Sequence, residues 1–129
     1  MFTFGDRSRS ILENVQLELR ILAERVIKIS PIDFAITSGL RTRDEQQKLY
    51  ESGKSKTLNS KHLSGKALDF VPWHSGTAYF YDLGSCSLIA GLFIALAEES
   101  LQLKIRTGVL WDGNLVSANE FLDAYHIEI

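Results

Sequence analysis

The sequence has little cysteine, no secretory-type leader and no excess of positive charge. The single cysteine, Cys86, excludes an internal disulfide and a metal site built from several thiolates, and we expect it in the core or a loop. A net charge of -2 argues against a nucleic-acid surface. The first ten residues have no apolar run behind a basic start, so we expect no export signal, and no stretch reaches the length of a membrane span.

The composition is that of one folded domain. With 129 residues and 45% hydrophobic content, the chain can bury a core without staples, and we expect a single domain over residues 1–129 that stays in the cytoplasm of the cell producing it. The positive charges are scattered, except for a group formed by Arg41, Arg43 and the lysines at 54, 56, 61 and 66. This group surrounds the candidate site described below and favours an anionic substrate.

The first half of the chain predicts two helices around a strand. Apolar residues recur at helical spacing from Ser10 to Ile29, which predicts one amphipathic helix. Asp33 to Ser38 reads as a short strand. Thr42 and Glu45 form a capping box for a helix that runs through Tyr50 and is closed by Gly53. Arg41 therefore lies at a strand-to-helix junction.

The second half predicts three more strands and two more helices. We expect a strand over Lys66–Val71 that ends at Pro72, followed by a glycine-containing aromatic loop over Trp73–Ser85. The apolar run Ser87–Ser100 predicts a buried helix, too short at 14 residues to span a bilayer. Further expected elements are a strand over Arg106–Trp111, a turn at 112–114, a helix over Ser117–Leu122 and a strand over Tyr125–Ile129.

A histidine and an aspartate seven residues apart suggest part of a metal site. An extended chain would place His62 and Asp69 roughly 23 Å apart, whereas ligands of one zinc ion lie at about 2.0 to 2.2 Å from it. The backbone must therefore fold back, and Gly65 permits such a turn because it adopts positive φ readily. Asp69 would then lie on a rigid strand, with His62 on the loop before it.

The third ligand and a base are expected at the end of the chain. The chain has three histidines, His62, His74 and His126. His126 shares one face of the predicted last strand with Glu128. His74 matches no part of the pattern and is expected in a loop. Two histidines and a carboxylate suffice for a catalytic zinc, leaving one position for water. Asp123, three residues before His126, is the best candidate for the base, and Glu128 is a candidate hydrogen-bond partner of a ligand.

The residues of Ser60–Asp69 match a family signature. They fit the pattern Ser-x-His-x-x-Gly-x-Ala-x-Asp of the peptidase M15 family, which contains D-alanyl-D-alanine carboxypeptidases and dipeptidases and phage L-alanyl-D-glutamate endopeptidases. The similarity continues in order through Thr37–Thr42 with Gln46, through Gly53–Asn59 and to Asp123–His126. The stretch from 53 to 69 most resembles the short phage endolysins.

The resemblance implies a fold and a set of roles. The fold would be α+β, a small antiparallel sheet flanked by helices as in Hedgehog and D-alanyl-D-alanine peptidase domains. His62, Asp69 and His126 would bind Zn²⁺, and Asp123 would be the general acid and base. Arg41 would neutralise charge on the substrate carbonyl or carboxylate, and Ser60 would contact the substrate or a ligand.

The sequence departs from the family pattern in two places. The closing segment, usually Pro-His-Phe-Glu, is here residues 125–128, Tyr-His-Ile-Glu, which keeps the ligand. The usual Trp-Gly-Gly-Asp element is only echoed by residues 110–113, Leu-Trp-Asp-Gly. The resemblance therefore does not specify the residues on the substrate-side wall of the cleft.

The expected function is that of a phage-type endolysin. It would be a monomeric zinc peptidase that cleaves the L-alanyl-D-glutamate bond of the peptidoglycan stem peptide after holin-dependent release, causing host cell lysis and acting as an antimicrobial. One alternative is a D-alanyl-D-alanine carboxypeptidase or dipeptidase. Another is a zinc fold that binds cell-wall peptide without cleaving it.

Overall fold

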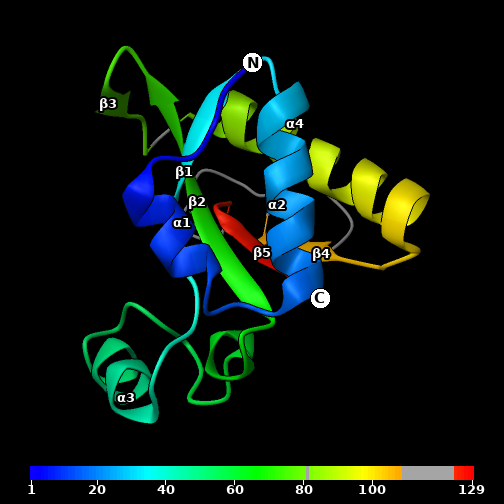
Figure 1. The fold of residues 1–129 in the computed structure, drawn as a ribbon. Coiled ribbons are helices and arrows are strands. Elements are labelled where there is room, and N and C mark those ends of the chain that lie inside the picture. The colour runs from blue at the N-terminus through cyan, green and yellow to red at the C-terminus, as the bar shows by residue number, and fades with distance from the viewer. Residues whose placement is uncertain (81, 109–123) are drawn as a thin grey trace.

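A computed structural model describes residues 1–80, 82–108 and 124–129 of the chain (Figure 1). The described helices are α1 (Asp6–Leu12), α2 (Leu17–Ile29), α3 (Arg43–Glu51) and α4 (Leu83–Leu96), with a 3-10 turn η1 (Lys61–Ser64) and a π-helical turn η2 (Ala97–Leu101). The described strands are β1 (Asp33–Ser38), β2 (Ala67–His74), β3 (Thr77–Ala78), β4 (Arg106–Thr107) and β5 (His126–Glu128).

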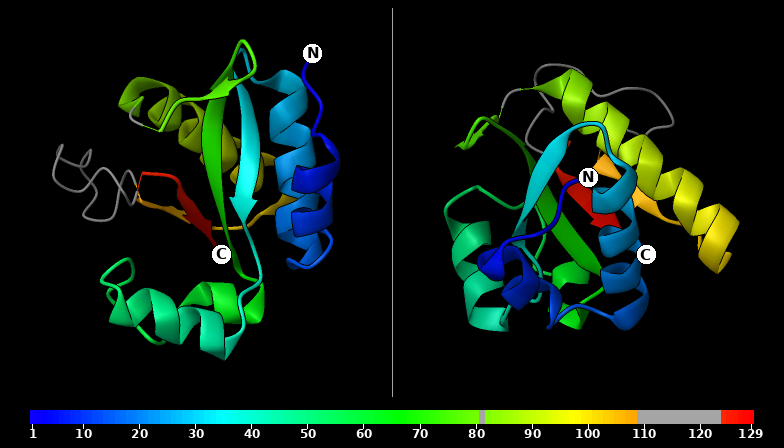
Figure 2. Two further views of the ribbon diagram at one scale, coloured as in Figure 1. Left: turned by 90° about the vertical axis from the view of Figure 1, so that its left-hand side faces the viewer. Right: turned by 45° about the horizontal axis from the view of Figure 1, so that its top comes forward.

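The strands form one antiparallel sheet in the order β1-β2-β5-β4, with β3 paired to β2. The predicted α+β class with a small antiparallel sheet is confirmed. The predicted strand Asp33–Ser38 is confirmed residue for residue, and so is the capping box between Thr42 and Glu45 at the start of α3. Helix α3 and η1 lie together beyond one end of the long β1–β2 pair (Figures 1 and 2).

The core lies between one face of the sheet and helices α2 and α4. Phe34 of β1, Phe70 of β2 and Phe93 of α4 contact one another, with ring centroids 5.8 to 6.2 Å apart. Each of these rings is buried, and burial of such a side chain stabilises the fold by about 1.5 to 3 kcal/mol. These contacts fix the two longest strands and α4 in one rigid unit.

Alternation along the strands places polar residues on the opposite face. Leu68 and Phe70 of β2 and Ile127 of β5 belong to the buried core. Because successive side chains of a strand point to opposite faces, Asp69 and His126 project away from α2 and α4. The core therefore orients the candidate ligands.

The predicted single helix from Ser10 to Ile29 is wrong, because two helices occupy this stretch. Gln16 lies between them in an extended conformation and donates its backbone N–H to the carbonyl of Gly65, 2.9 Å away. Helical spacing of apolar residues continues across the break, so the pattern could not reveal it. Ser8 is buried in α1, and its side chain accepts a hydrogen bond from the backbone N–H of Ile36.

The prediction that Pro72 ends the second strand is also wrong, because β2 continues to His74. The backbone N–H of Phe70 donates to Tyr125 on the β5 side. The backbone nitrogen of Pro72, two residues further along, points toward the same side of β2. Pro72 lies beyond the three residues of β2 that pair with β5, so the strand loses no hydrogen bond to β5 through the missing N–H of proline. The expected loop that follows contains a hairpin, in which Ser75 and Gly76 both have positive φ between β2 and β3.

The predicted helix Ser87–Ser100 begins earlier, at Leu83, and is capped by the side chain of Asp82. It buries one face, including Cys86, rather than its whole circumference, and Leu88 is 40% exposed. With η2, the helical segment Leu83–Leu101 has 19 residues and is long and apolar enough by composition to cross a membrane, although a third of it is buried in this fold. The expectation that it is too short to span a bilayer rested on 14 residues and does not hold.

Some predictions fall outside the described residues. Strand β4 covers only the start of the expected strand Arg106–Trp111. The expected turn at 112–114 and helix Ser117–Leu122 lie in the part of the chain that is not described. Of the expected last strand Tyr125–Ile129, β5 accounts for its middle three residues.

Candidate active site

Sheet pairing places two of the predicted ligands directly opposite each other. In the β2–β5 register Asp69 is the partner of His126, so their side chains leave neighbouring strands on the same face. His126 Nδ1 lies 3.1 Å from Asp69 Oδ1. Residues 57 positions apart in the chain are thus brought together by backbone pairing.

The glycine-bounded turn brings in the third predicted ligand. His62 lies in η1, which ends at Gly65 with a φ of 71°, so the predicted positive φ is confirmed. The side chain of Ser60 accepts the backbone N–H of His62 and caps this turn. His62 Nε2 lies 3.3 Å from Asp69 Oδ2, and the two histidine rings have centroids 5.0 Å apart.

One nitrogen of His62 is held in a state suited to binding a cation. The carbonyl of Gly39 lies 2.7 Å from Nδ1 and can only accept, so Nδ1 carries the proton and Nε2 has a free lone pair. Nε2 is buried and makes no hydrogen bond to any residue that the structure describes. An unpaired buried acceptor is costly, so this nitrogen is suited to a metal ion.

His62, Asp69 and His126 together have the donor set of a zinc site. One ligand atom from each lies within 4.8 Å of the others. Tetrahedral ligands about 2.1 Å from an ion are roughly 3.4 Å apart, and each histidine has one carboxylate oxygen of Asp69 at such a distance, His126 Nδ1 at 3.1 Å from Oδ1 and His62 Nε2 at 3.3 Å from Oδ2. The residues present therefore fit a metal ion with two nitrogen ligands and one carboxylate.

The third histidine of the chain does not join this cluster. His74 is the last residue of β2 rather than a loop residue, and its ring packs edge-on against Tyr79 with centroids 4.7 Å apart. Its Nε2 lies 3.5 Å from Asp82 Oδ2.

Arg41 is joined to the cluster through Asp69. Its Nη2 lies 3.0 Å from Asp69 Oδ2, and its backbone N–H donates to the carbonyl of His62. Its Nη1 donates to Oε1 of Gln46, a fully buried residue of α3. The sequence offered Gln46 only as part of a resemblance, although a polar side chain on the inward face of an amphipathic helix is a signal for such a role.

The outer nitrogen of His126 has its own partner. His126 Nε2 lies 2.9 Å from Glu128 Oε1, and the other carboxylate oxygen lies 3.5 Å from Nη1 of Arg106. Arg106 and Glu128 are direct partners in the β4–β5 pair. The hydrogen bond expected from the shared strand face is present, whereas Arg106 was not anticipated from the sequence.

The pKa shifts follow from these contacts. Burial by itself raises the pKa of Asp69, but the hydrogen bond from His126 and the close approach of both imidazole rings hold it well below its usual value. Burial lowers the pKa of His126, and the carboxylates of Asp69 and Glu128 more than offset this and raise it. Asp69 is therefore ionised and ready to bind a cation at neutral pH.

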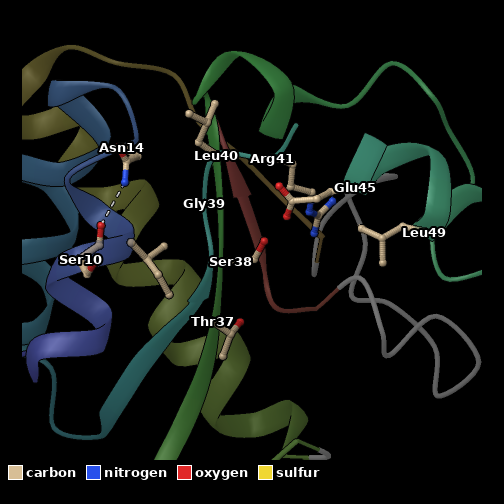
Figure 3. A pocket seen from close by; sticks show the side chains of 10 residues that line it. Ser10, Asn14, Thr37, Ser38, Gly39, Leu40, Arg41, Glu45 and Leu49 are labelled. Carbon is tan, nitrogen blue, oxygen red and sulfur yellow. Dashed lines mark hydrogen bonds between the residues drawn. The ribbon is translucent and has the colours of Figure 1, made fainter. Parts of the chain in front are cut away.

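The cluster lines a cleft of about 510 Å³. The described residues lining it include the three candidate ligands, Arg41, Ser60, Glu128, Arg106 and most of the 53–61 loop. A second hollow of about 470 Å³ lies between the end of α1 and α3, where Ser38, Arg41 and Glu45 point toward the same space (Figure 3). Arg41 lines both hollows, but the candidate ligands line only the first.

The predicted acid/base Asp123 lies outside the described residues, as do residues 110–113. The next described residues are Ala124, which is buried, and Tyr125, whose carbonyl pairs with β2. The predicted role of Asp123 therefore stays a prediction.

Comparisons with known proteins find related peptidases. The model of a family described as phage L-alanyl-D-glutamate peptidase matches residues 1–129. The chain is 33% identical over 116 residues to the L-alanyl-D-glutamate peptidase of Escherichia phage T5, covering 88% of this chain and 84% of that protein. The crystal structure of the Serratia marcescens L-Ala D-Glu endopeptidase ChiX has the same fold, with a TM-score of 0.83, 24% identity and coverage of 98% of this chain and 90% of that one.

Proposed function

Because the chain belongs to the phage L-alanyl-D-glutamate peptidase family, we propose that it is a zinc-dependent endopeptidase that cleaves this bond in the peptidoglycan stem. The observation that carries the proposal is the His62, Asp69 and His126 cluster at the wall of an open cleft, with the buried His62 Nε2 unpaired. Two nitrogens and one carboxylate leave a fourth position open, as in catalytic rather than structural zinc sites.

The protein's own residues divide the work of hydrolysis. Zinc, when bound, supplies Lewis acidity that polarises the scissile carbonyl and makes water easier to deprotonate. Asp123 takes a proton from the attacking water and returns it to the leaving amine, so one carboxylate serves as base and then as acid. Arg41 stabilises negative charge on the carbonyl oxygen as the tetrahedral intermediate forms. Gln46 accepts a hydrogen bond from the Arg41 guanidinium and so fixes its orientation toward the cleft.

Ser60 has two roles in this proposal. It caps the turn that carries His62, and its side chain lines the cleft, where it contacts the substrate. The first role positions a ligand, and the second adds a hydrogen-bond partner for the peptide.

We further propose that the enzyme acts in host cell lysis as a monomer. The phage T5 relative supports a phage-type role. The protein would accumulate in the cytoplasm of the producing cell and reach the wall with the help of a holin, and a purified preparation would act as an antimicrobial on exposed walls. In this proposal α4 remains part of the folded core, because its buried face packs against the sheet and α2.

Digestion of purified sacculi with and without zinc tests the proposal. We expect new N-terminal D-glutamate in the released muropeptides, detected by mass spectrometry, and loss of activity after chelation. Free D-alanine without new N-terminal D-glutamate would instead favour the carboxypeptidase or dipeptidase alternative. Tight sacculus binding without cleavage over a broad range of pH and metal would favour the non-catalytic alternative.

Histidine variants provide a matched control. His62→Ala and His126→Ala should lose zinc binding and cleavage, whereas His74→Ala, which removes a histidine outside the cluster, should retain both. Asp123→Ala should bind zinc normally and lose turnover. Unchanged turnover of Asp123→Ala would overturn the assigned acid/base.

A further inference from the structure

The cleft is far more basic than the protein as a whole. Among the residues that the structure describes, five cationic side chains line it against two carboxylates, although the chain carries a net charge of -2. A cleft lined by one sign of charge concentrates ligands of the opposite sign. The cationic residues are Arg41, Lys54, Lys56, Lys61 and Arg106, and the carboxylates are Asp69 and Glu128.

The two carboxylates are already committed inside the cleft. Asp69 contacts Arg41 and both histidines, and Glu128 contacts His126 and Arg106. Neither carboxylate is left to neutralise the lysines that line the cleft. In the described part of the chain, Lys54, Lys56 and Lys61 form no ion pair, and all three are exposed.

The loop that carries Lys54 and Lys56 and leads to Lys61, the first residue of η1, is fixed to the catalytic side of the cleft. Gln46 donates from Nε2 to Ser55 Oγ at 2.8 Å and to the carbonyl of Thr57 at 2.7 Å, while its Oε1 accepts from Arg41. The backbone N–H of Lys54 donates to Leu49 at the end of α3. The loop and the guanidinium that faces Asp69 therefore share one buried anchor, and the lysines are presented at a defined place beside the cluster.

The proposed substrate carries a charge that matches this rim. A glutamyl residue whose amino group forms the scissile bond uses one carboxyl to continue the peptide and keeps the other free. That free carboxylate lies within one residue of the bond to be cut. We propose that the lysine rim of the cleft, Lys54, Lys56 and Lys61, binds this carboxylate and selects stem peptides in which it is ionised rather than amidated. The inference rests on the proposed function and specifies its substrate.

Two synthetic peptides test the inference. Both contain the L-alanyl-D-glutamyl bond, and they differ only in whether the free carboxyl is a carboxylate or a carboxamide. We expect kcat/KM to be about 10-fold higher for the carboxylate, the size of one charge-assisted hydrogen bond in a partly exposed site. The preference should appear mainly in KM and should shrink at high salt.

Lysine variants assign the preference to the rim. Lys54→Gln, Lys56→Gln, Lys61→Gln and the triple variant should lower kcat/KM for the carboxylate and leave the carboxamide unchanged. Lys28→Gln, in the last turn of α2 and outside the cleft, is the matched control and should change neither. Equal zinc content of all variants would show that the metal cluster is intact.

The outcomes separate the two proposals. Equal cleavage of both peptides by the wild-type enzyme, or a preference for the carboxamide, would overturn the inference and leave the proposed function standing. The inference is also overturned if the lysine variants lower both rates alike, since the rim would then serve the fold or general attraction. If the wild-type enzyme cleaves neither peptide under conditions where zinc is bound, the proposed function fails and the inference fails with it.

Discussion

Replacing Gly65 with alanine tests whether the turn that delivers His62 depends on close backbone packing. Gly65 has a φ of +71°, and a Cβ there would lie 3.2 Å from the carbonyl oxygen of Asn14, 3.4 Å from the nitrogen of Gln16 and 3.5 Å from Cα of Val15. All three are backbone atoms, which cannot rotate away. The contact is with the segment between α1 and α2 that hydrogen-bonds to Gly65.

The expected cost has two parts. A left-handed conformation costs a non-glycine residue about 1 to 2 kcal/mol, and overpacking against a rigid neighbour adds about 1 to 3 kcal/mol. Gly65→Ala should therefore lower the free energy of unfolding by about 2 to 5 kcal/mol. Because the displaced turn carries His62, zinc affinity should fall as well.

Gly53→Ala is the matched control. Gly53 has a similar φ of +77°, but a Cβ there would meet nothing within 4 Å. Gly53→Ala should lower the free energy of unfolding by only about 1 to 2 kcal/mol and leave zinc affinity unchanged. Urea unfolding of the chelator-treated proteins measures the stability, and calorimetric titration measures zinc binding. Equal destabilisation by the two substitutions would refute the packing argument, since φ alone would then account for both.

Three further predictions concern hydrogen bonds and ionisation. Glu128→Ala should weaken zinc binding about 10- to 100-fold in calorimetry because His126 Nε2 loses its partner, and Glu128→Gln should restore part of the affinity; an unchanged constant would contradict this. Asp82→Ala should lower stability by about 1 kcal/mol because it removes the cap of α4. Hydrogen bonds from Ser85 lower the pKa of Asp82 in the folded protein. The stabilisation by this cap is therefore present above pH 3.8 and is lost as the pH falls through the lowered pKa of the folded state. The urea midpoints of wild type and Asp82→Ala should converge in acid. The raised pKa of His126 stabilises the metal-free protein fully below pH 6.5, and this stabilisation is lost as the pH rises through the folded value; in chelator, a His126→Gln variant should lack this decline in its urea midpoint.

Local signals predicted several elements well. The capping box of Thr42 and Glu45 and the β-branched and aromatic run Asp33–Ser38 each specify their own structure through neighbours close in sequence. The positive φ of Gly65 followed from a reach argument, since two ligands of one ion cannot lie on an extended chain.

Signals that depend on distant partners were misread. Apolar spacing continues through Gln16, but its backbone N–H is bonded to Gly65, far along the chain, in the break between the first helix and the second. Pro72 looked like a stop because the sequence does not show which edge of the strand has a partner at that point. Nothing local to Arg106 shows that sheet pairing sets it opposite Glu128.

The sequence by itself determined the chemistry of this protein. It provided two histidines and an aspartate as candidate ligands, a glycine that permits the turn between two of them, and the match to a peptidase family. These features follow from residue identity and from spacing over a few residues, and neither depends on how the rest of the chain folds.

The tertiary structure decided how those groups meet. Antiparallel pairing puts Asp69 opposite His126, and the carbonyl of Gly39 fixes the protonated nitrogen of His62. Gln46 ties Arg41 to the lysine-bearing loop through a buried amide. Each of these contacts joins segments brought together by folding around a common core, and hydrogen-bond geometry between such segments is a property of their packing rather than of either segment alone.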